Sequence, residues 1–218
     1  MNCHKESRMK RKDRPFLVCI TGGIASGKTA VCKYIESLEY KVYYADIIAS
    51  NVRDEPKNID ILIERYGDRV LDKGTFSKEK LSKIVFTDSK ELQFLNNLIH
   101  PLVRKKIQNI TEESTEGIIF FEIPLLFESK LEAAFDLTVN ISADLQDRIL
   151  RIIDRDGVTK ENALKRISSQ MSGVLKRKKA DITIENNKST KDLTAKVALL
   201  LKDIPNMPQK KIKRITDL

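Results

Sequence analysis

The sequence predicts an α/β fold in which a parallel five-stranded sheet has helices on both faces and carries an inserted all-helical lobe. The first observation is a set of five short apolar runs, rich in strand-forming residues and separated by helical spacing: 16–20, 41–45, 118–121, 137–141 and 181–184. Unbroken apolar strands that alternate with helices are typical of parallel sheets covered on both faces. The second is the segment 54–99, where apolar residues follow helical spacing throughout, so we expect it to be an insert. The third is size, because 218 residues with 41% hydrophobic content can bury one such core.

Capping and breaking residues predict where the helices of the insert begin and end. Ser77 is predicted to cap a short helix, and Asp88 with Glu91 forms the capping-box pattern that opens the next one. Pro101 is predicted to break that helix and to stand in the first turn of another, because proline lacks the N–H that a helix interior uses. The insert is therefore expected to be wholly helical.

Charge and cysteine content restrict the class of protein. The 40 basic and 31 acidic residues give a net charge of +9, concentrated in the segment 148–179 and in the two ends, 1–14 and 203–218. This distribution fits the handling of a polyanion near 148–179, whereas the ends are interpreted as solvated tails. Three cysteines and two histidines offer neither a disulfide framework nor a zinc site. Since no apolar run approaches the roughly 18 residues of a membrane span, we expect a soluble, cytoplasmic protein without a membrane partner.

A glycine-rich motif between the first strand and the first helix predicts nucleotide binding. Residues 22–29 satisfy G-x-x-x-x-G-K-[ST], with the preceding strand and following helix that the motif requires. Its glycines let successive backbone N–H groups point at phosphate oxygens, and the helix N-terminus adds partial positive charge. Lys28 is predicted to reach the β- and γ-phosphates of ATP, and the Thr29 hydroxyl to ligate Mg²⁺. The predicted ATP-binding residues are Gly22, Gly23, Ile24, Ala25, Ser26, Gly27, Lys28, Thr29 and Ala30.

Two acidic residues stand at the ends of predicted strands. Asp46 follows the second strand, and Glu122 follows the third. Ligands of open α/β sheets bind beyond the carboxyl ends of the strands, so Asp46 could accept the proton of an attacking hydroxyl, and Glu122 could assist a metal or the acceptor. Equally, Asp46 could cap the helix that follows it, and Glu122 could cap a loop before Pro124. The spacing leaves both interpretations open.

An arginine stripe is predicted within the basic segment. Arg148, Arg151 and Arg155 share one helical face, while apolar residues occupy another. Guanidinium groups on a mobile helix could close over a transferring phosphoryl group, neutralise its charge and expel water. A charged stripe is more often a solvated face, but the phosphate-binding motif favours a lid.

The motifs together resemble the dephospho-CoA kinase family from about residue 15 to residue 201. The matching strings are 20–24, 45–48, 98–103, 123–128, 151–157, 166–170, 180–181 and 186–187. The pair His100-Pro101 and the string Pro-Leu-Leu-Phe-Glu at 124–128, in this order, are the most specific of them. One departure is Glu39, where the family has a glycine near the end of the first helix.

The resemblance implies ATP-dependent phosphorylation of the ribose 3′-hydroxyl of dephospho-CoA, with Mg²⁺, as the last step of coenzyme A synthesis. Asp46 would be the general base, Lys28 and Arg155 would be further catalytic residues, and Asn187 would lie near the adenine. The residues implied at the acceptor are Thr21, Asp46, His100, Arg104, Glu122, Pro124 and Leu125.

The resemblance also implies a division of the chain. A nucleotide-binding core would comprise 15–50, 101–145 and 176–204, with a helical CoA-binding lobe at 51–100 and a lid at 146–175. The remaining segments, 1–14 and 205–218, are the basic tails.

Two other functions remain as alternatives. The nearest is another small-molecule kinase, such as a nucleoside monophosphate kinase. A nucleotide-gated nucleic-acid binder is suggested by the net charge of +9, but the slightly acidic remainder of the chain argues against it. We therefore expect ATP and dephospho-CoA as partners, no specific nucleic acid, and a monomer or weak homo-oligomer.

Overall fold

The computed structural model describes residues 14–218, which form two compact units. The larger unit runs up to Tyr44 and resumes with Ile110–Leu218, and the smaller comprises Ala45–Asn109. The expected insert 51–100 falls within the smaller unit, and the expected lid 146–175 falls within the larger. The chain leaves the larger unit directly after a strand.

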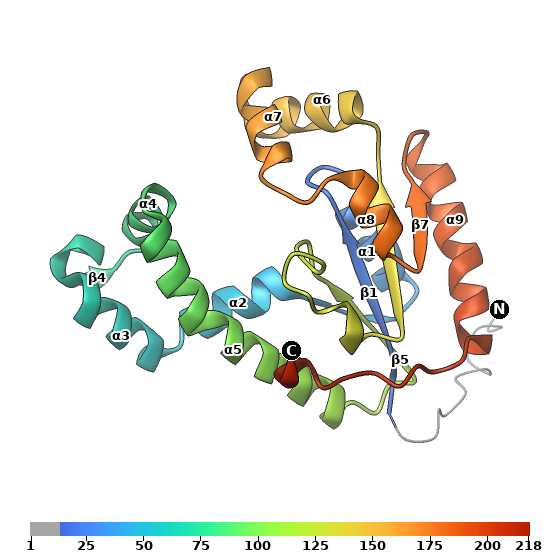
Figure 1. Ribbon diagram of the computed structural model, residues 1–218, viewed down its shortest axis with the longest axis horizontal. Helices are drawn as coiled ribbons and strands as arrows, with labels where there is room; N and C mark the ends of the chain where they lie inside the picture. Colours follow the sequence, from blue (N-terminus) through green and yellow to red (C-terminus); the bar gives the residue numbers. More distant parts are fainter. Residues whose placement is uncertain (1–13) are drawn as a thin grey trace. The chain divides into compact units, whose positions relative to one another are not determined.

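The larger unit contains five parallel strands in the order β2-β5-β1-β6-β7 (Figure 1). They are β1 Phe16–Gly22, β2 Lys41–Tyr44, β5 Ile118–Glu122, β6 Leu137–Ser142 and β7 Ile182–Glu185. In the register of the sheet, Glu122 at the end of β5 lies opposite Ile20 of β1 and Tyr44 of β2. The predicted fold class is confirmed, and each predicted strand position carries a strand.

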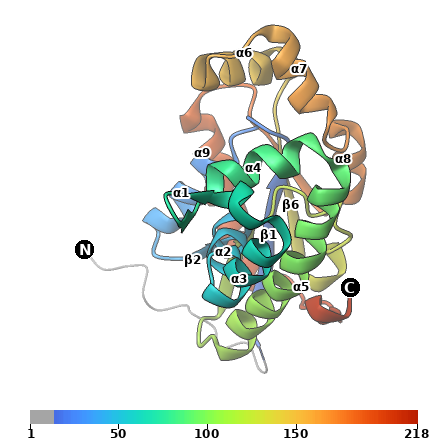
Figure 2. The ribbon, with the colours of Figure 1, turned by 90° about the vertical axis from the view of Figure 1, so that its left-hand side faces the viewer.

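Helices cover both faces of this sheet (Figure 2), as the apolar strands predicted. The helices of this unit are α1 Lys28–Ser37, α6 Leu145–Asp156, α7 Lys160–Ser168, α8 Gly173–Lys179 and α9 Thr190–Asp203. On one face, Val18, Ile20 and Phe120 are buried in a core shared with α1 and α9. On the other, Phe121 stacks on Tyr43 with ring centroids 5.5 Å apart, and α8 covers this side. The alternation of Phe120 and Phe121 follows from the two-residue period of a strand.

The smaller unit is mainly helical and has a core of its own. Its helices are α2 Ala45–Arg53, α3 Pro56–Tyr66, the 3₁₀ turn η1 Gly67–Val70, α4 Lys78–Thr87 and most of α5 Ser89–Glu113. Leu62, Val70, Leu81 and Val85 are buried in one cluster. These residues come from α3, η1 and α4, so the short helices stabilise one another through this shared core.

The prediction that 54–99 is wholly helical is wrong at one place. Residues 71–76 form an antiparallel hairpin of β3 Leu71–Asp72 and β4 Thr75–Phe76. Between the strands, Lys73 and Gly74 have φ values of 48° and 80°. A tight two-residue hairpin turn needs this pair of positive values. Helical spacing did not reveal the hairpin because strands of two residues carry no periodicity.

The predicted break at Pro101 is also wrong, because α5 continues through the proline over 25 residues. A proline costs roughly 3 kcal/mol in a helix interior. Ile99 and Ile107, on either side of it, are nevertheless buried. Burial of an apolar face, rather than local propensity, decides whether such a helix continues.

The predicted helix starts are confirmed in part. The Ser77 hydroxyl accepts a backbone N–H of α4 at 3.3 Å, which is the expected cap. The Asp88 carboxylate accepts the backbone N–H two residues further on at 2.8 Å. Glu91 does not close the capping box in return but binds Arg65 at 2.8 Å. Tertiary contact between α5 and α3 therefore takes the side chain that the local pattern assigned to the cap.

The C-terminal segment 205–218 packs on the rest of the larger unit, so the expectation of a solvated tail is wrong for this end. Ile215 is 3% exposed, and Arg214 forms an ion pair with Glu112 at 3.0 Å. Lys210 forms another with Asp181 at 2.6 Å. Part of the basic charge of this tail is thus used in internal pairs. The expectation for the N-terminal tail concerns residues 1–13, which lie outside the described part of the chain.

Asp136 connects the two ends of the described chain. Its carboxylate is 2% exposed and accepts two hydrogen bonds from the Arg14 guanidinium, at 2.5 and 2.9 Å. It also accepts the backbone N–H groups of Leu17 at 2.9 Å and Lys210 at 2.8 Å. Four donors therefore surround one buried carboxylate. Its single negative charge holds together three segments of the chain, those that contain Arg14, Asp136 and Lys210.

Asp136→Asn is expected to lower the free energy of unfolding by about 3 kcal/mol, since it removes the charge that pairs with Arg14 and turns an amide NH₂ toward donors. Urea unfolding of both proteins checks this, with an unchanged denaturant slope as the sign that only stability has moved. Asp203→Asn, at an exposed position of α9, is the matched control. Equal stability of D136N and D203N would contradict the prediction.

Candidate active site

The glycine-rich motif forms the turn between β1 and α1, as predicted. Gly22 and Gly27 have φ values of 148° and 105°, and neither position has room for a side chain. A Cβ at Gly22 would lie 2.3 Å from the Ile141 carbonyl oxygen, and one at Gly27 would lie 2.3 Å from Asn186 Nδ2. That amide nitrogen donates to the Ser26 carbonyl at 2.9 Å. The glycines thus allow β6 and the loop after β7 to hold the backbone of the turn.

Lys28 lies inside this turn. Its Nζ donates to the carbonyl oxygens of Gly22 at 3.1 Å and Gly23 at 3.2 Å. The Glu122 carboxylate lies 3.9 Å from the same nitrogen. Glu122 is buried, with 8% of its surface exposed. The two predicted site residues Lys28 and Glu122 are therefore brought together at the carboxyl ends of β1 and β5.

Two arginines of the predicted stripe reach the same loop from α6. Arg148 Nε donates to the Ile24 carbonyl at 2.8 Å, and Arg151 donates to the carbonyls of Ala25 and Asn186, each at 3.2 Å. Burial lowers the pKa of Arg148 from its ordinary value. The Ile24 carbonyl partly replaces the water that this guanidinium loses. With Lys28, these side chains place three cations around one turn.

Helices α6 and α7 also pack on the loop through apolar contacts. Ile24 and Ala25 lie against Ile149 and Ile152 of α6 and Ala163 of α7. Ala25 adopts a left-handed φ of 59°, a conformation that costs about 1 kcal/mol or more for a residue with a side chain. Its methyl group gains apolar contact with α6 and α7 in return.

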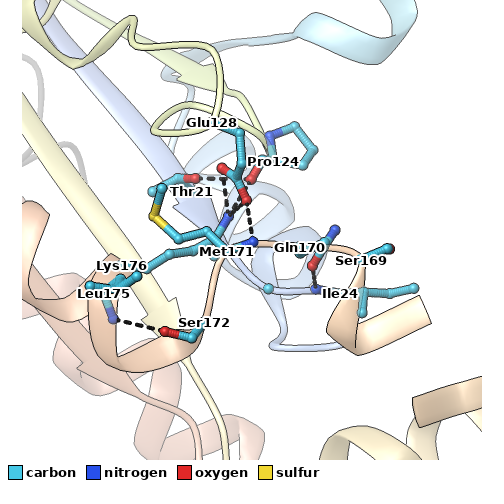
Figure 3. Close-up of polar contacts among 12 residues, drawn as sticks. Thr21, Ile24, Pro124, Glu128, Ser169, Gln170, Met171, Ser172, Leu175 and Lys176 are labelled. Atoms are coloured by element: carbon cyan, nitrogen blue, oxygen red, sulfur yellow. Dashed lines mark hydrogen bonds and ion pairs between the residues drawn. The ribbon is translucent and has the colours of Figure 1, made fainter. Parts of the chain in front are cut away.

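The segment between α7 and α8 is tied to the same region (Figure 3). The Ile24 backbone N–H donates to Gln170 Oε1 at 2.8 Å, and Met171 N–H donates to the Glu128 carboxylate at 2.9 Å. Lys176 of α8 is 1% exposed and binds Glu128. Sequence reasoning counted Lys176 only as part of the basic segment, since nothing in the run 176–179 distinguishes it from its exposed neighbours.

Most of the residues implied at the acceptor in the larger unit gather at one turn after β5. Thr21 Oγ1 donates to the Pro124 carbonyl at 3.3 Å, and Glu122 precedes this turn. Leu125 is 44% exposed. A partly exposed apolar side chain beside buried polar groups is a typical lining for a small-molecule site.

The other residues implied at the acceptor belong to the smaller unit. Asp46 is exposed in the first turn of α2, two residues after β2 ends. His100 and Arg104 stand one turn apart on α5. Desolvation, and then the charge of Arg104, lower the pKa of His100. This favours the neutral imidazole, which can both accept and donate a hydrogen bond.

Two residues of the predicted site make other contacts in this structure. The Arg155 side chain is 59% exposed and binds Asp156 through two hydrogen bonds, at 2.7 and 2.9 Å. Asn187 exchanges two hydrogen bonds with Asp144, at 3.0 and 3.1 Å. It thereby fixes the start of α6, while its neighbour Asn186 contacts the glycine-rich turn.

The residues present fit a bound triphosphate with Mg²⁺. Thr29 is exposed in the first turn of α1, and Gly27, the cap of that helix, provides no side-chain bond to its first N–H groups. Ser26 Oγ is buried and has no hydrogen-bond partner among the described residues. Residues 14–218 hold no group of three or more acidic, histidine or cysteine side chains placed so that they could bind a metal ion. Mg²⁺ in nucleotide sites is typically held by one or two protein oxygens together with phosphates and water, which suits a single hydroxyl.

Comparison with known proteins identifies relatives of this chain. Residues 16–192 match the family model described as dephospho-CoA kinase. A dephospho-CoA kinase of Fusobacterium nucleatum is 40% identical over 183 residues, which cover 84% of this chain and 95% of that protein. One of Leptospira interrogans is 40% identical over 176 residues, covering 79% and 85%.

Solved structures agree with these relatives. The crystal structure of TT1252 from Thermus thermophilus matches with a TM-score of 0.78 and 31% identity, over 88% of this chain and 99% of that one. A dephospho-CoA kinase from Campylobacter jejuni matches with a TM-score of 0.68 and 28% identity, over 87% and 97%. A shikimate kinase from Acinetobacter baumannii, with a TM-score of 0.51, 14% identity and coverage of 87% and 94%, shares the fold alone. The glycine-rich turn with its three cations, the matching family model and these relatives show that the chain belongs to the dephospho-CoA kinase family.

Proposed function

We propose that this chain is a kinase that transfers the γ-phosphoryl group of ATP to the 3′-hydroxyl of the ribose of dephospho-CoA. The observation that carries the proposal is the convergence of Lys28, Arg148 and Arg151 on the glycine-rich turn, in a chain that matches the family over 16–192. Phosphoryl transfer requires little covalent chemistry from the protein, so positioning and neutralisation of charge are its main contributions. A turn flanked by three cations is suited to both.

In this proposal the phosphates of ATP lie against the turn formed by residues 22–30. Backbone N–H groups of the turn and the N-terminus of α1 would donate to the phosphate oxygens. Lys28, whose ammonium bonds the carbonyls of the turn, would rotate toward the β- and γ-phosphates. Asn187 would border the adenine, fixed by its two bonds to Asp144.

Asp46 would accept the proton of the attacking hydroxyl. The support for this is chain connectivity, because β2 ends at Tyr44 opposite Glu122. Two residues span at most about 7 Å, so Asp46 cannot be far from this carboxyl edge of the sheet. The remaining acceptor contacts would come from Thr21, Glu122, Pro124 and Leu125, with His100 and Arg104 from the smaller unit.

Mg²⁺ would be held by the Thr29 hydroxyl together with phosphate oxygens, and Glu122 could reach it through water. When bound, the ion withdraws charge from the transferring phosphoryl group. Residues of the chain would do the rest: they orient the acceptor, exclude water beneath the lid and take up the proton.

Arg155→Ala is expected to lower turnover by about 10²-fold with little change in the KM for ATP, because a lid arginine acts on charge that develops during transfer. In this structure Arg155 binds Asp156, so it would have to exchange that partner when the lid closes. Steady-state kinetics with both substrates varied test this, with Lys165→Ala, at an exposed position of α7, as control. If only the KM for ATP rises, Arg155 is a ground-state anchor and not a catalytic group.

The decisive test of the proposed function is incubation of the chain with ATP, Mg²⁺ and a panel of acceptors. Turnover of dephospho-CoA with the product phosphorylated at the ribose 3′-position supports it. Preferential turnover of nucleoside monophosphates would assign the chain to the alternative kinase class instead.

The expected setting is the cytoplasm, and the expected state is a monomer or weak homo-oligomer. No helix in the described part of the chain combines the length and apolar character of a membrane span. The basic segment, which contributes to the net charge that suggested nucleic-acid binding, directs Arg148 and Arg151 toward the glycine-rich turn. Binding to mixed-sequence RNA or DNA should accordingly be weak and should fall steeply with salt.

A further inference from the structure

One lysine of the basic run in α8 is buried. Lys176 is 1% exposed, whereas residues 177–179 are exposed. Its Nζ donates to the Pro124 carbonyl at 2.9 Å and lies 2.9 and 3.1 Å from the two carboxylate oxygens of Glu128 (Figure 3). The ammonium therefore donates one hydrogen bond to Pro124 and one to Glu128, with which it also forms an ion pair.

The Pro124 carbonyl is held from two sides. Thr21 Oγ1, at the end of β1, donates to it at 3.3 Å, and Lys176 of α8 donates from another direction. One residue earlier, the Ile123 N–H donates to Ile20 at 3.0 Å and continues the pairing of β5 with β1. The start of the turn thus has a fixed place relative to the end of β1.

Glu128, at the other end of the same turn, is fixed by two contacts. It accepts Met171 N–H at 2.9 Å and pairs with Lys176. Burial raises the pKa of Glu128, but hydrogen bonds from Lys176 and Met171 outweigh it, so the net pKa is lowered. The carboxylate is consequently charged at neutral pH, and the pair is ionic.

An ion pair between a buried lysine and a partly exposed carboxylate adds little net stability, because lost hydration offsets the attraction between the two ions. An apolar residue at position 176 would fill the same space without that cost. What an apolar residue could not provide is the hydrogen-bond donor that Lys176 places at the Pro124 carbonyl. The lysine is therefore explained by geometry and not by stability.

We propose that Lys176 is a positioning residue for the acceptor, which fixes the turn 124–128 against the end of β1 through the Pro124 carbonyl and Glu128. The inference rests on the proposed function, because it takes this turn as one border of the acceptor site. Leu125, the exposed residue of the turn, is the side chain whose place depends most directly on the two anchors. Lys176 itself does not touch the reacting atoms.

The test compares K176M, E128Q and the double variant K176M/E128Q with wild type, and uses K178M, at an exposed position of the same helix, as control. For each protein we measure the melting temperature and the KM and kcat for ATP and for dephospho-CoA. K176M leaves Glu128 charged and unpaired and is expected to melt at a lower temperature. The double variant removes both charges and is expected to regain most of that loss, but it still lacks the donor to Pro124.

The positioning role predicts that kcat/KM for dephospho-CoA stays about tenfold or more below wild type in the double variant, with the KM for ATP within twofold. E128Q, which keeps the Lys176–Pro124 bond, should lie closer to wild type in acceptor kinetics. If K176M does not fold, the double variant and E128Q still give this comparison. Acceptor kinetics that recover together with the melting temperature would overturn the positioning role and leave a purely structural one. Wild-type protein without turnover of dephospho-CoA would instead overturn the proposed function, which separates the two failures.

Discussion

Asp46→Asn is expected to lower turnover of dephospho-CoA by a factor of about 10²–10⁴, the range associated with loss of a positioned general base. Asparagine keeps the size of the side chain but cannot take up the proton of the 3′-hydroxyl. Asp46 is exposed, so the loss should come from chemistry and not from unfolding. ATP binding should be unchanged, because the carboxylate is proposed to contact the acceptor hydroxyl and not the phosphates.

Steady-state kinetics with each substrate varied, together with a direct ATP-binding measurement, check this prediction. Asp60→Asn is the matched control, since Asp60 is an exposed aspartate of α3 in the same unit. Turnover of D46N within a few-fold of wild type would remove Asp46 from the catalytic role and favour its alternative role in the first turn of α2. A loss of ATP binding would instead place the carboxylate on the nucleotide.

Lys28→Met should also have a large effect, with a fall in turnover of about 10²–10³-fold, the usual consequence of removing one preorganised charge from a site where negative charge develops. The Lys28 ammonium is held between the carbonyls of Gly22 and Gly23, with Glu122 at 3.9 Å. Methionine has a similar length but no charge, so the variant has no positive charge from α1 at the carbonyls of the turn.

The measurement is again kcat and KM for both substrates, with the melting temperature of each variant. Lys33→Met, at an exposed position of the same helix, is the control. K28M is expected to lose turnover and some ATP affinity, because the same charge serves ground and transition states. Activity within tenfold of wild type would show that Arg148 and Arg151 suffice and that Lys28 is not required.

The glycine-rich turn illustrates how much of the site could be predicted from the sequence. The motif and its place between a strand and a helix predicted the turn. In the structure, Gly22 and Gly27 have positive φ values and no room for a Cβ. Glu39 is a related case, because it occupies a φ of 64° at the position where the resemblance expects glycine. In each case the requirement is local backbone geometry, which a short string of residues can carry.

The arginine stripe of α6 illustrates what spacing could not predict. Helical spacing put Arg148, Arg151 and Arg155 on one face, but it could not say which guanidinium reaches the turn. The structure directs the first two to the carbonyls of the turn and pairs Arg155 with Asp156. That choice depends on how α6 packs against Ile24 and Ala25, a contact between segments more than a hundred residues apart in the chain.

The sequence by itself determined the parallel sheet, the nucleotide-binding turn and the family resemblance, because periodicity, glycine geometry and short motifs are properties of neighbouring residues. Only the tertiary structure decided that α5 runs through Pro101, that the C-terminal segment packs through Ile215, and that Lys176 is buried among equally basic neighbours. Each of these depends on a partner that is remote in the chain, and burial against such a partner can outweigh any local preference.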